Sequence, residues 1–339
     1  MLGLLRRGWS LPLLESARLN AAACTVAFRG AGFRSGILRR LAERPATPEQ
    51  LAAAQGLDPS AADGLRAWLD LGVTFGELAE RDGRYGIGGR GLRRLLRPGN
   101  DPVVAYYEEM AFLYQRLITE TPDRLRTGEL FTLDDLDPTI VARTSRISEP
   151  WIAAALDLAV PTGGPVRLLE VGCGSGAHIR AAAERNPDLT AVGVELQESA
   201  AAAARRNIAD WGLADRVRIE VGDIRDLTGH GEYDLVTLHQ NIYYFPAAEQ
   251  PALLAHLRTF LAPGGTLLVT SAVRGAGQAT AGLDLWGAMT VGTERMPLPD
   301  ALPPLMRDAG FVDAASVPLG RDGMYRAFVA TNPGTAAPR

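Results

Sequence analysis

The sequence contains 339 residues, of which 47% are hydrophobic, and its formal net charge at pH 7 is −4. A chain of this length and composition buries a large core and is expected to form two domains. Because the net charge is slightly negative, it gives no overall attraction to nucleic acid or to an anionic membrane, and a small-molecule partner is favoured.

Two cysteines occur, Cys24 and Cys173, so no disulfide framework is expected and the composition is typical of a reducing, cytoplasmic compartment. Arg6 and Arg7 interrupt the apolar amino terminus before it reaches the length of a signal peptide. No uncharged apolar stretch approaches the roughly eighteen residues of a membrane-spanning helix. We therefore expect no membrane partner.

Residues 13–44 place apolar and basic residues at helical spacing, which predicts two helices. The glycines of Gly30-Ala-Gly32 predict the break between them, so the second helix is expected from about Ser35 to Glu43. Thr47-Pro-Glu-Gln50 then has the composition of a capping box, with proline in the first turn. This motif predicts a short helix that ends at Gly56.

A second capped helix and a hairpin follow. Asp58-Pro59 opens a helix that is expected to end before Gly72. The residues expected on or near its buried face are Leu65, Trp68, Leu69 and Leu71. Asp82-Gly83 then lies between two short extended segments and is a strong local signal for a hairpin. Two capped helices followed by a hairpin predict a winged helix-turn-helix domain over residues 1–100.

The charge of this module bears on its function. A DNA-reading helix presents basic residues to the major groove. Between Ser60 and Gly72, however, Arg66 is the only basic residue, against Asp63 and Asp70. The sequence therefore disfavours nucleic-acid binding. A ligand-sensing, DNA-binding regulator is kept as the alternative from another functional class.

A helical connector is expected over residues 101–160, after the turn-rich segment Arg97–Pro102. Its first helix carries aromatic side chains on more than one face, among them Tyr107 and Phe112. The elements expected in this region are a helix over 103–118, a loop with one helical turn over 119–137 and a helix over 138–158.

The apolar run 166–171 is followed by three glycines at alternate positions and then by an alanine-rich helix over 177–185. These glycines, Gly172, Gly174 and Gly176, therefore lie on a strand-to-helix turn. Glycine permits backbone angles that are closed to other residues and lets a ligand approach without meeting a Cβ. The free N–H groups at the start of the next helix would face that ligand.

Acidic residues lie at or just beyond the carboxyl ends of three successive predicted strands: Glu170, Glu195 and Asp223. Ligands of parallel sheets bind at these ends. Glu195 is placed to accept hydrogen bonds from both hydroxyls of a ribose. Asp223 is placed to accept the exocyclic amine of an adenine, and the side chains of Leu196 and Ile224 suit the two ring faces.

These residues resemble a known family, the class I S-adenosylmethionine-dependent methyltransferases. Glu170-x-Gly-x-Gly-x-Gly176, Glu195 and Gly222-Asp223 match its first three motifs in order and spacing, and the resemblance covers about residues 150–332. It implies S-adenosyl-L-methionine as the cofactor, bound in a Rossmann-like, doubly wound α/β domain over residues 161–332. An NAD-dependent Rossmann oxidoreductase is the enzymatic alternative, although its fingerprint, Gly-x-Gly-x-x-Gly, differs from the spacing here.

The whole chain looks like the two-domain small-molecule O-methyltransferases, in which an amino-terminal winged helix serves dimerisation. The resemblance therefore implies a homodimeric, cytoplasmic enzyme that methylates an oxygen or a carbon of a small molecule of secondary metabolism. It also implies a substrate pocket lined by connector helices and the later part of the sheet domain, although ordinary core packing explains the same residues. The residues assigned to this pocket are Tyr107, Phe112, Tyr244, Trp286 and Met289.

His239 follows the fourth predicted strand. With an intrinsic pKa of about 6.5 it could take a proton from the acceptor, or it could contact the cofactor without proton transfer. Tyr243 is a poor base but a good orienting group. In the resembling family a catalytic histidine and an acid stand where this chain has Tyr243 and Tyr244, so that base is missing unless His239 replaces it. This departure leaves room for an acceptor that is already acidic or nucleophilic.

The remaining pattern completes a sheet of alternating strands and helices. The parallel strands are expected at 166–171, 189–194, 216–221, 233–238 and 265–271. A helix over 300–310 and an antiparallel pair of strands, 311–319 and 324–331, are expected to follow, with a disordered tail over 333–339. The other histidines lack the spacing of metal ligands and no metal is expected; they are His178, His230 and His256.

Overall fold

The computed structural model describes residues 9–334, with the side chains of Ser10 and Ala279 left out of the description. The chain forms two compact units. The helical unit comprises the residues up to Thr127 together with Asp134–Ile147, and the sheet unit comprises Gly128–Leu133 and the residues from Ser148 on. Within the described residues, no helix has the length and apolar character needed to cross a membrane. The predicted tail lies outside the description from residue 335 on, and the three-part division into domains stays a prediction.

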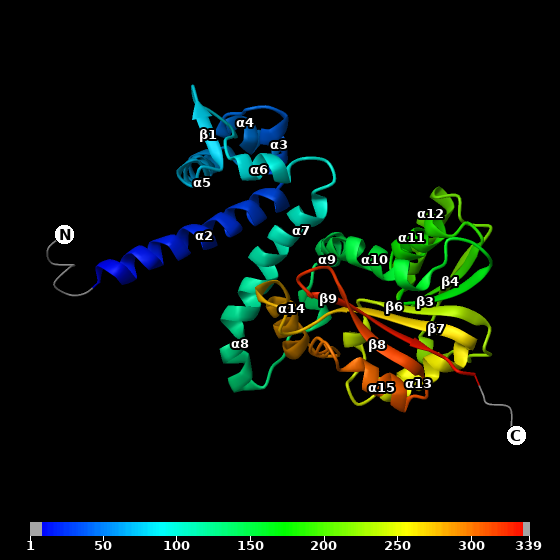
Figure 1. Cartoon of the computed structure of the whole chain (residues 1–339). Helices are drawn as coiled ribbons and strands as arrows, with labels where there is room; N and C mark the ends of the chain where they lie inside the picture. The colour runs from blue at the N-terminus through cyan, green and yellow to red at the C-terminus, as the bar shows by residue number, and fades with distance from the viewer. Residues whose placement is uncertain (1–8, 335–339) are drawn as a thin grey trace, which may run out of the picture. The chain divides into compact units, whose positions relative to one another are not determined.

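The helical unit begins with α2 (Ser10–Arg34), which runs through the glycines at which a break was predicted (Figure 1). That prediction was wrong because Gly30 and Gly32 allow close packing instead of ending the helix. A Cβ on Gly30 would lie 2.5 Å from the Cβ of Ala111, and one on Gly32 would lie 2.6 Å from Leu38 Cγ. The turn comes at Gly36, whose φ is 76°, and α3 (Ile37–Glu43) follows.

The next elements are α4 (Pro48–Ala54), η1 (Pro59–Ala61), α5 (Ala62–Thr74), β1 (Leu78–Arg81), β2 (Arg84–Ile87) and α6 (Arg90–Leu95). The capping box is confirmed, since Gln50 N donates to Thr47 Oγ1 and Thr47 N donates to Gln50 Oε1. The hairpin is confirmed as well, with Asp82 and Gly83 in its turn. These are the elements expected of a winged helix, and that assignment stays a prediction.

Two details of α5 differ from the prediction. The helix continues past Gly72 to Thr74. Glycine is needed at this position for packing, because a Cβ there would lie 2.3 Å from the ring of Phe28. Leu71 is exposed, whereas Leu65 and Leu69 are buried and Trp68 stacks on Phe28. The buried face of this helix is therefore narrower than its composition indicated.

A continuous helical stretch follows, made of α7 (Asp101–Glu109), the π-helical turn η2 (Met110–Tyr114) and α8 (Gln115–Thr127). The loop predicted from residue 119 was wrong in its first half, because α8 continues to Thr127. Glu120 accepts hydrogen bonds from Arg116 Nε at 2.9 Å and from Arg124 Nη2 at 3.0 Å, and such pairs one turn apart stabilise a helix.

The helix predicted over 138–158 is divided into α9 (Pro138–Thr144), the short turn η4 (Ser145–Ser148) and α10 (Glu149–Ala159). Asp137 caps the first part, and its Oδ1 accepts from Thr139 N at 3.0 Å. Pro150 lacks the N–H that a helix interior requires and is tolerated only in the first turn of α10. Proline therefore explains the interruption.

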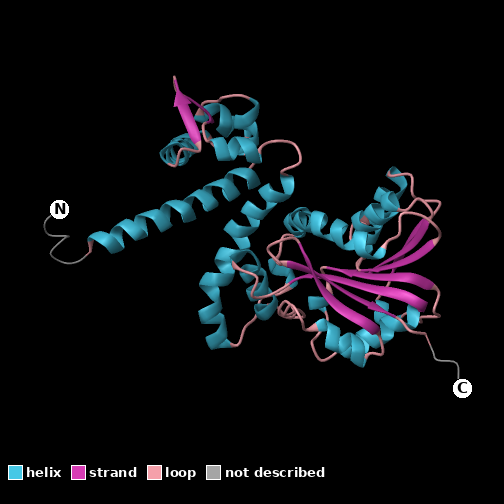
Figure 2. Ribbon diagram, in the orientation of Figure 1, coloured by secondary structure: helices cyan, strands magenta, loops and turns pink. Residues whose placement is uncertain are grey.

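The sheet unit contains seven strands in the order β5-β4-β3-β6-β7-β9-β8. Figure 2 shows these strands side by side in a twisted sheet. Five run parallel, and β9 is antiparallel to both β7 and β8. The strands are β3 (Val166–Val171), β4 (Leu189–Glu195), β5 (Val217–Val221), β6 (Tyr233–His239), β7 (Leu261–Ala272), β8 (Val312–Leu319) and β9 (Tyr325–Thr331). The predicted parallel strands and the final antiparallel pair are confirmed.

Helices cover both faces of this sheet, as Figure 1 shows. One face is covered by α10, α11 (Ala177–Arg185) and α12 (Glu198–Asp210), and the other by α13 (Gln250–Phe260) and α15 (Leu302–Asp308). Apolar side chains from α10, α11 and α12 pack on Leu168, Ala191 and Ile219 of the sheet. The predicted doubly wound α/β architecture is confirmed. Its parallel strands bring the loops after β3, β4, β5 and β6 to one edge.

Candidate active site

The glycine loop after β3 has the backbone conformation that its composition predicted. Gly172, Gly174 and Gly176 have φ values of 66°, 54° and 79°, in the left-handed region that side chains disfavour. A Cβ on Gly172 would lie 2.4 Å from Asn241 Nδ2, so this glycine also admits a neighbouring side chain. The loop is held to the next strand, because Gly172 N donates to Val194 O at 2.8 Å.

Glu195 ends β4 and fastens the same loop. Its Oε2 accepts a hydrogen bond from Gly174 N at 2.9 Å, and its Oε1 accepts one from Gln197 N at 3.1 Å. A carboxylate has about four lone-pair sites, so both oxygens keep the capacity to accept ribose hydroxyls. Leu196 beside it is 63% exposed and offers an apolar surface.

Asp223 follows β5 and forms a two-pronged ion pair with Arg225, whose Nη2 lies 2.6 Å from Oδ2. The guanidinium lowers the pKa of this carboxyl below its usual value, so it stays ionised and able to accept hydrogen bonds. Arg225 was not predicted as a site residue. Ile224 is only 3% exposed, which leaves little of its side chain for a ligand, and its predicted place over an adenine stays a prediction.

Glu170 is buried in β3 beside two histidines. Its Oε1 lies 3.1 Å from His178 Nδ1, and its Oε2 has no hydrogen-bond partner. Burial raises the pKa of Glu170 above its usual value, against the opposing effect of His178. The rings of His178 and His239 meet edge to face with centroids 5.0 Å apart. A polar cluster thus lies under the glycine loop, and His178 was missed because its spacing fits no metal motif.

His239 is buried at the end of β6, with Nδ1 2.9 Å from Thr270 Oγ1 and no partner at Nε2. Burial, followed by the nearby His178, lowers the pKa of His239 well below its ordinary value. The imidazole is therefore neutral at physiological pH. A neutral ring of low basicity binds and orients well but is a weak proton acceptor.

The two residues after His239 were missed by sequence reasoning. Asn241 Nδ2 donates to Val171 O at 2.6 Å, and its Oδ1 is buried without a partner. Gln240 Oε1 accepts from Ala272 N at 3.1 Å, and its Nε2 is likewise buried without a partner. No composition signal separates these amides from ordinary loop residues. Their roles emerge only when β3, β6 and β7 lie side by side.

Aromatic side chains meet beyond this polar segment. Tyr243 and Tyr244 in η6 (Ile242–Tyr244) have ring centroids 5.0 Å apart, and Trp286 of α14 (Gln278–Met289) lies 6.0 and 5.8 Å from them. Trp286 is 4% exposed and its Nε1 has no partner. Met289, at the end of the same helix, is buried too. The structure thus brings Tyr243, predicted as an orienting group, together with the predicted pocket residues Tyr244 and Trp286.

Tyr107 and Phe112 lie in the helical unit. The hydroxyl of Tyr107 accepts a hydrogen bond from Arg29 Nη1 at 2.7 Å, and Arg34 lies over the ring of Phe112 at 4.5 Å. Both side chains are therefore engaged within their own unit. Their predicted place in a substrate pocket stays a prediction.

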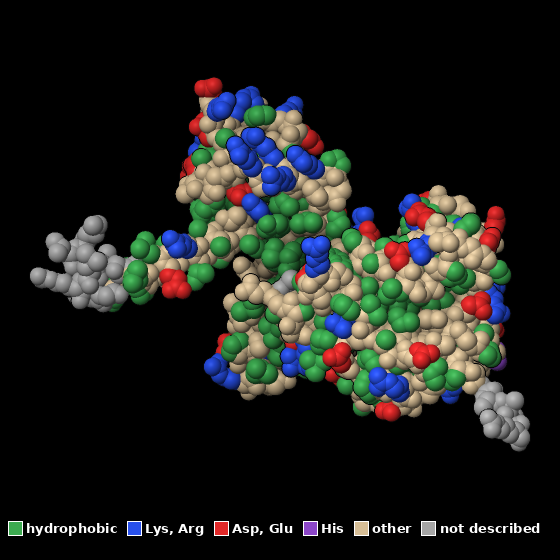
Figure 3. Space-filling model, in the orientation of Figure 1, with side chains coloured by type: hydrophobic (Ala, Val, Ile, Leu, Met, Phe, Trp, Pro, Cys, Tyr) green, Lys and Arg blue, Asp and Glu red, His purple; other side chains and the backbone are tan. Residues whose placement is uncertain are grey.

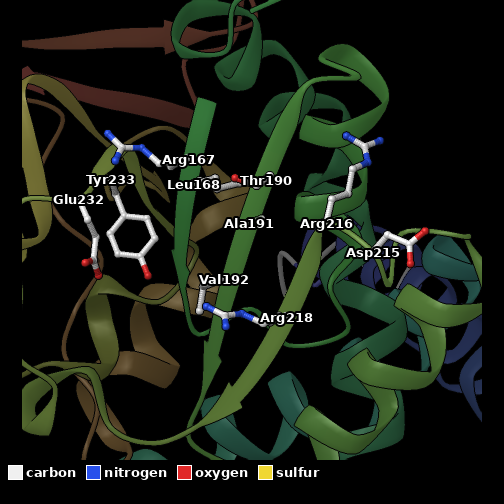
Figure 4. A pocket seen from close by; sticks show the side chains of 10 residues that line it. All are labelled: Arg167, Leu168, Thr190, Ala191, Val192, Asp215, Arg216, Arg218, Glu232 and Tyr233. Atoms are coloured by element: carbon white, nitrogen blue, oxygen red, sulfur yellow. The ribbon is translucent and has the colours of Figure 1, made fainter. Parts of the chain in front are cut away.

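A cavity of about 420 Å³ lies at the other end of the strands (Figure 4). Its lining residues are Arg167, Leu168, Thr190, Ala191, Val192, Asp215, Arg216, Arg218, Glu232 and Tyr233. Arg167 is paired with Asp234, and Arg216 donates to main-chain carbonyls such as Leu189 O. Because ligands of such sheets bind at the carboxyl ends of the strands, we do not assign the chemistry to this cavity.

Comparison with known proteins identifies the domain. Residues 168–265, which include the glycine loop, Glu195 and Asp223, match the family model described as a methyltransferase domain. The chain is 27% identical to the demethylspheroidene O-methyltransferase of Cereibacter sphaeroides, over 88% of this chain and 82% of that protein. The protein is an S-adenosylmethionine-dependent methyltransferase.

Solved structures show the same fold as this methyltransferase. The mitomycin 7-O-methyltransferase MmcR has a TM-score of 0.77 at 21% identity, covering 96% of this chain and 99% of that one. An O-methyltransferase from neocarzinostatin biosynthesis, solved with S-adenosylmethionine and 2-hydroxy-5-methyl naphthoic acid, has a TM-score of 0.70 at 24% identity, covering 91% and 96%.

The residues of the methyltransferase fit its cofactor. The glycine loop lacks the Cβ atoms that would block a close approach, and Glu195 and Asp223 are acceptors for hydroxyl and amine groups. The unpartnered oxygens Glu170 Oε2 and Asn241 Oδ1 suit the positively charged end of the cofactor. No metal enters this account.

Proposed function

We propose that the methyltransferase acts on a planar small molecule of natural-product biosynthesis, at an oxygen or a carbon. The aromatic cluster of Tyr243, Tyr244 and Trp286 carries this proposal, because it lies on the elements that follow β6 and β7, next to the strands that hold the glycine loop. Aromatic walls with a few polar groups are typical of sites for such ligands. The names of the relatives and structural neighbours support the same class of substrate.

The mechanism rests on positioning. Bound S-adenosylmethionine supplies a methyl group on a sulfonium centre. We assign the cofactor to Glu170, the glycine loop, Glu195, Leu196, Asp223 and Ile224. Tyr243 and Tyr244 orient the acceptor, and His239 contacts the reacting centre as a neutral group. Alignment of two reactants removes much of the barrier to such a transfer.

The low basicity of His239 constrains the acceptor. Tyr243 and Tyr244 stand where the resembling enzymes have a histidine and an acid, and burial of His239 makes it a weak base. The proposal therefore favours an acceptor that ionises without strong base catalysis, such as an enol or an acidic phenol.

Titration calorimetry with S-adenosylhomocysteine and with NAD tests the class of cofactor. We expect saturable binding of S-adenosylhomocysteine and none of NAD. A second measurement follows the labelled methyl group of S-adenosylmethionine into a panel of planar phenols and enols. Binding of NAD without S-adenosylhomocysteine would refute the assignment, and transfer to peptides but to no small molecule would refute the substrate class.

The proposal includes a homodimer in the cytoplasm. Apolar side chains stand exposed along α2, among them Leu11, Leu14 and Leu19. Figure 3 shows hydrophobic side chains on the surface of this helix, with charged side chains between them. A long helix with exposed leucines is typical of an interface between subunits. Cys24 and Cys173 form no disulfide, which supports a reducing compartment.

A further inference from the structure

The unpartnered polar atoms at the carboxyl edge of the sheet fall into two groups. On the side of β3 they are hydrogen-bond acceptors, Glu170 Oε2 and Asn241 Oδ1. On the side of β7 they are donors, Gln240 Nε2, Arg274 Nε and Trp286 Nε1. Because β6 lies between β3 and β7, the two groups flank its end. We call the second group the donor side.

Gln240 is held on the donor side by a strained backbone. Its φ is 54°, in the left-handed region that is unfavourable for a non-glycine residue. The other non-glycine residues of positive φ in residues 9–334 are aspartates, Asp82 in a tight turn and Asp313 beside an irregular strand pairing. Gln240 has neither explanation. Strain of this kind is typical of functional sites.

The hydrogen bonds of Gln240 fix the orientation of its amide. The main-chain N–H of Ala272 donates to it at 3.1 Å, so the atom facing Ala272 must be Oε1. Its own main-chain N–H donates to Thr270 O at 2.9 Å. The NH₂ group of Gln240 is therefore a buried donor without a partner.

The other two donors are linked to Gln240 through short stretches of chain. Arg274 lies two residues after Ala272 and has no ion-pair partner among the described residues. Trp286 contacts Tyr243, three residues after Gln240. The donor side thus combines one positive charge, two neutral N–H donors and aromatic rings. His239 Nε2, beside Gln240, is also without a partner, and it is a further donor when Nδ1 accepts the hydrogen bond from Thr270 Oγ1.

We infer that the donor side binds an anionic oxygen of the acceptor molecule, in the form of a carboxylate, enolate or phenolate. This inference rests on the proposed function and specifies its substrate class. A negatively charged oxygen is the kind of partner that these buried donors lack, and hydrogen bonds from N–H groups to charged oxygen are about twice as strong as neutral ones. Stabilising the anion also lowers the pKa of an acceptor hydroxyl, which replaces part of the work of a missing base.

The test uses a matched pair of probes, 2-naphthoate and the uncharged 2-naphthamide, in the presence of saturating S-adenosylhomocysteine. Calorimetry should show naphthoate binding about tenfold or more tightly than the amide. Gln240→Glu keeps an oxygen for Ala272 N but replaces the NH₂ donor with negative charge, so it should abolish the preference. Trp286→Phe keeps a ring without its N–H and Arg274→Met removes the charge, and each should reduce the preference.

Arg321→Gln serves as the charge control, because it removes one exposed arginine from the turn between β8 and β9. It should retain the preference for naphthoate. Equal binding of the two probes by the wild type, or an unchanged preference in all three donor-side variants, would overturn the inference. Binding of S-adenosylhomocysteine is measured separately, so failure of the inference is distinguished from failure of the proposed function. Loss of S-adenosylhomocysteine binding in Gln240→Glu with an unchanged probe preference would assign this donor to the cofactor.

Discussion

Each oxygen of Glu195 already accepts a main-chain hydrogen bond, so the side chain that we propose to bind the ribose also shapes the glycine loop. Asp223 is organised similarly, because Arg225 holds its carboxylate in place. At the scale of the residue, then, the site is built from acids whose orientation is set by neighbours. Because these side chains are already oriented, less conformational entropy is lost when a ligand binds.

Glu195→Gln tests this account. The glutamine oxygen can still accept from Gly174 N, but the second acceptor is replaced by a donor. We expect the dissociation constant for S-adenosylhomocysteine to rise roughly tenfold, the loss of one hydrogen bond to a charged group, with the melting temperature little changed. Calorimetry and thermal unfolding measure the two quantities. An equally large effect of Glu198→Gln, at the first residue of α12, would show that only the overall charge matters.

His239 gives a prediction about pH. Burial lowers its pKa well below the ordinary value of about 6.5, so the unfolded chain binds a proton that the folded chain excludes. The contribution of His239 to the free energy of unfolding is therefore complete above about pH 6.5 and decreases progressively as the pH falls below this value. Urea unfolding at pH 7.5 and 5.5 should show a smaller loss in His239→Gln than in the wild type. Equal losses in the two proteins would mean that His239 titrates normally when folded.

The positions of these residues followed from the sequence to different degrees. Glu170, Glu195 and Asp223 could be predicted because each ends or follows a strand whose pattern is clear. Arg225 and Gln240 could not, because their importance depends on which side chain or main-chain group a neighbouring element brings within hydrogen-bonding distance. The sequence pattern predicts where a residue lies along its strand. Its hydrogen-bond partners on a neighbouring strand depend on the register between the two strands, which the sequence pattern does not give.

Among the helices, glycines account for the differences in extent at Gly30, Gly32 and Gly72 between the expected and the observed structure. Gly30, Gly32 and Gly72 were interpreted as helix ends, yet each lies inside or at the packed face of a helix. A glycine that ends a helix and one that admits a neighbour look the same in a sequence. The structure distinguishes the two kinds of glycine, because a Cβ built on a packing glycine would clash with a neighbouring side chain.

Two alanine substitutions test this distinction. Gly30→Ala would place its Cβ 2.5 Å from Ala111 Cβ, so overpacking should lower the free energy of unfolding by about 1–3 kcal/mol. In α5, the Cβ of Gly64→Ala would have no atom within 4 Å. This substitution should raise the free energy of unfolding by about 0.5–1 kcal/mol, because alanine favours a helix interior more than glycine does. Urea unfolding measures both. A stabilising effect at both positions would show that α2 does not pack closely at Gly30.

The glycine loop provides a second pair. Gly172 and Gly174 both have positive φ, but a Cβ on Gly172 also meets Asn241 Nδ2, whereas one on Gly174 meets nothing within 4 Å. Gly172→Ala should therefore lose more stability and more affinity for S-adenosylhomocysteine than Gly174→Ala. Calorimetry on the two variants, which carry the same backbone penalty, isolates the contact with Asn241. The reverse order would place Asn241 away from the cofactor.

Across the whole chain, the parallel strands and the final antiparallel pair could be predicted because each strand is a short apolar run bounded by turn or helical segments. The order of the strands in the sheet was not predicted and comes from the structure. The function of the helical unit could not be derived in the same way. A hairpin after two helices is shared by DNA-binding and dimerising modules, and the acidic character of α5 separates them only in part. The exposed leucines of α2 provide the stronger argument for a dimerising module.

Leu11 and Leu14 lie three residues apart on α2, so they share one side of the helix and stand exposed together. If this side packs against a second copy of the chain, Leu11→Glu with Leu14→Glu should convert the dimer to a monomer, because each buried leucine contributes roughly 1.5–3 kcal/mol. Light scattering after size-exclusion chromatography measures the mass directly. The control, Leu298→Glu, changes another exposed leucine, in the sheet unit, and should leave the mass unchanged. A wild-type monomer at all concentrations, or a dimer that survives both glutamates, would show that the exposed leucines of α2 do not hold two copies together.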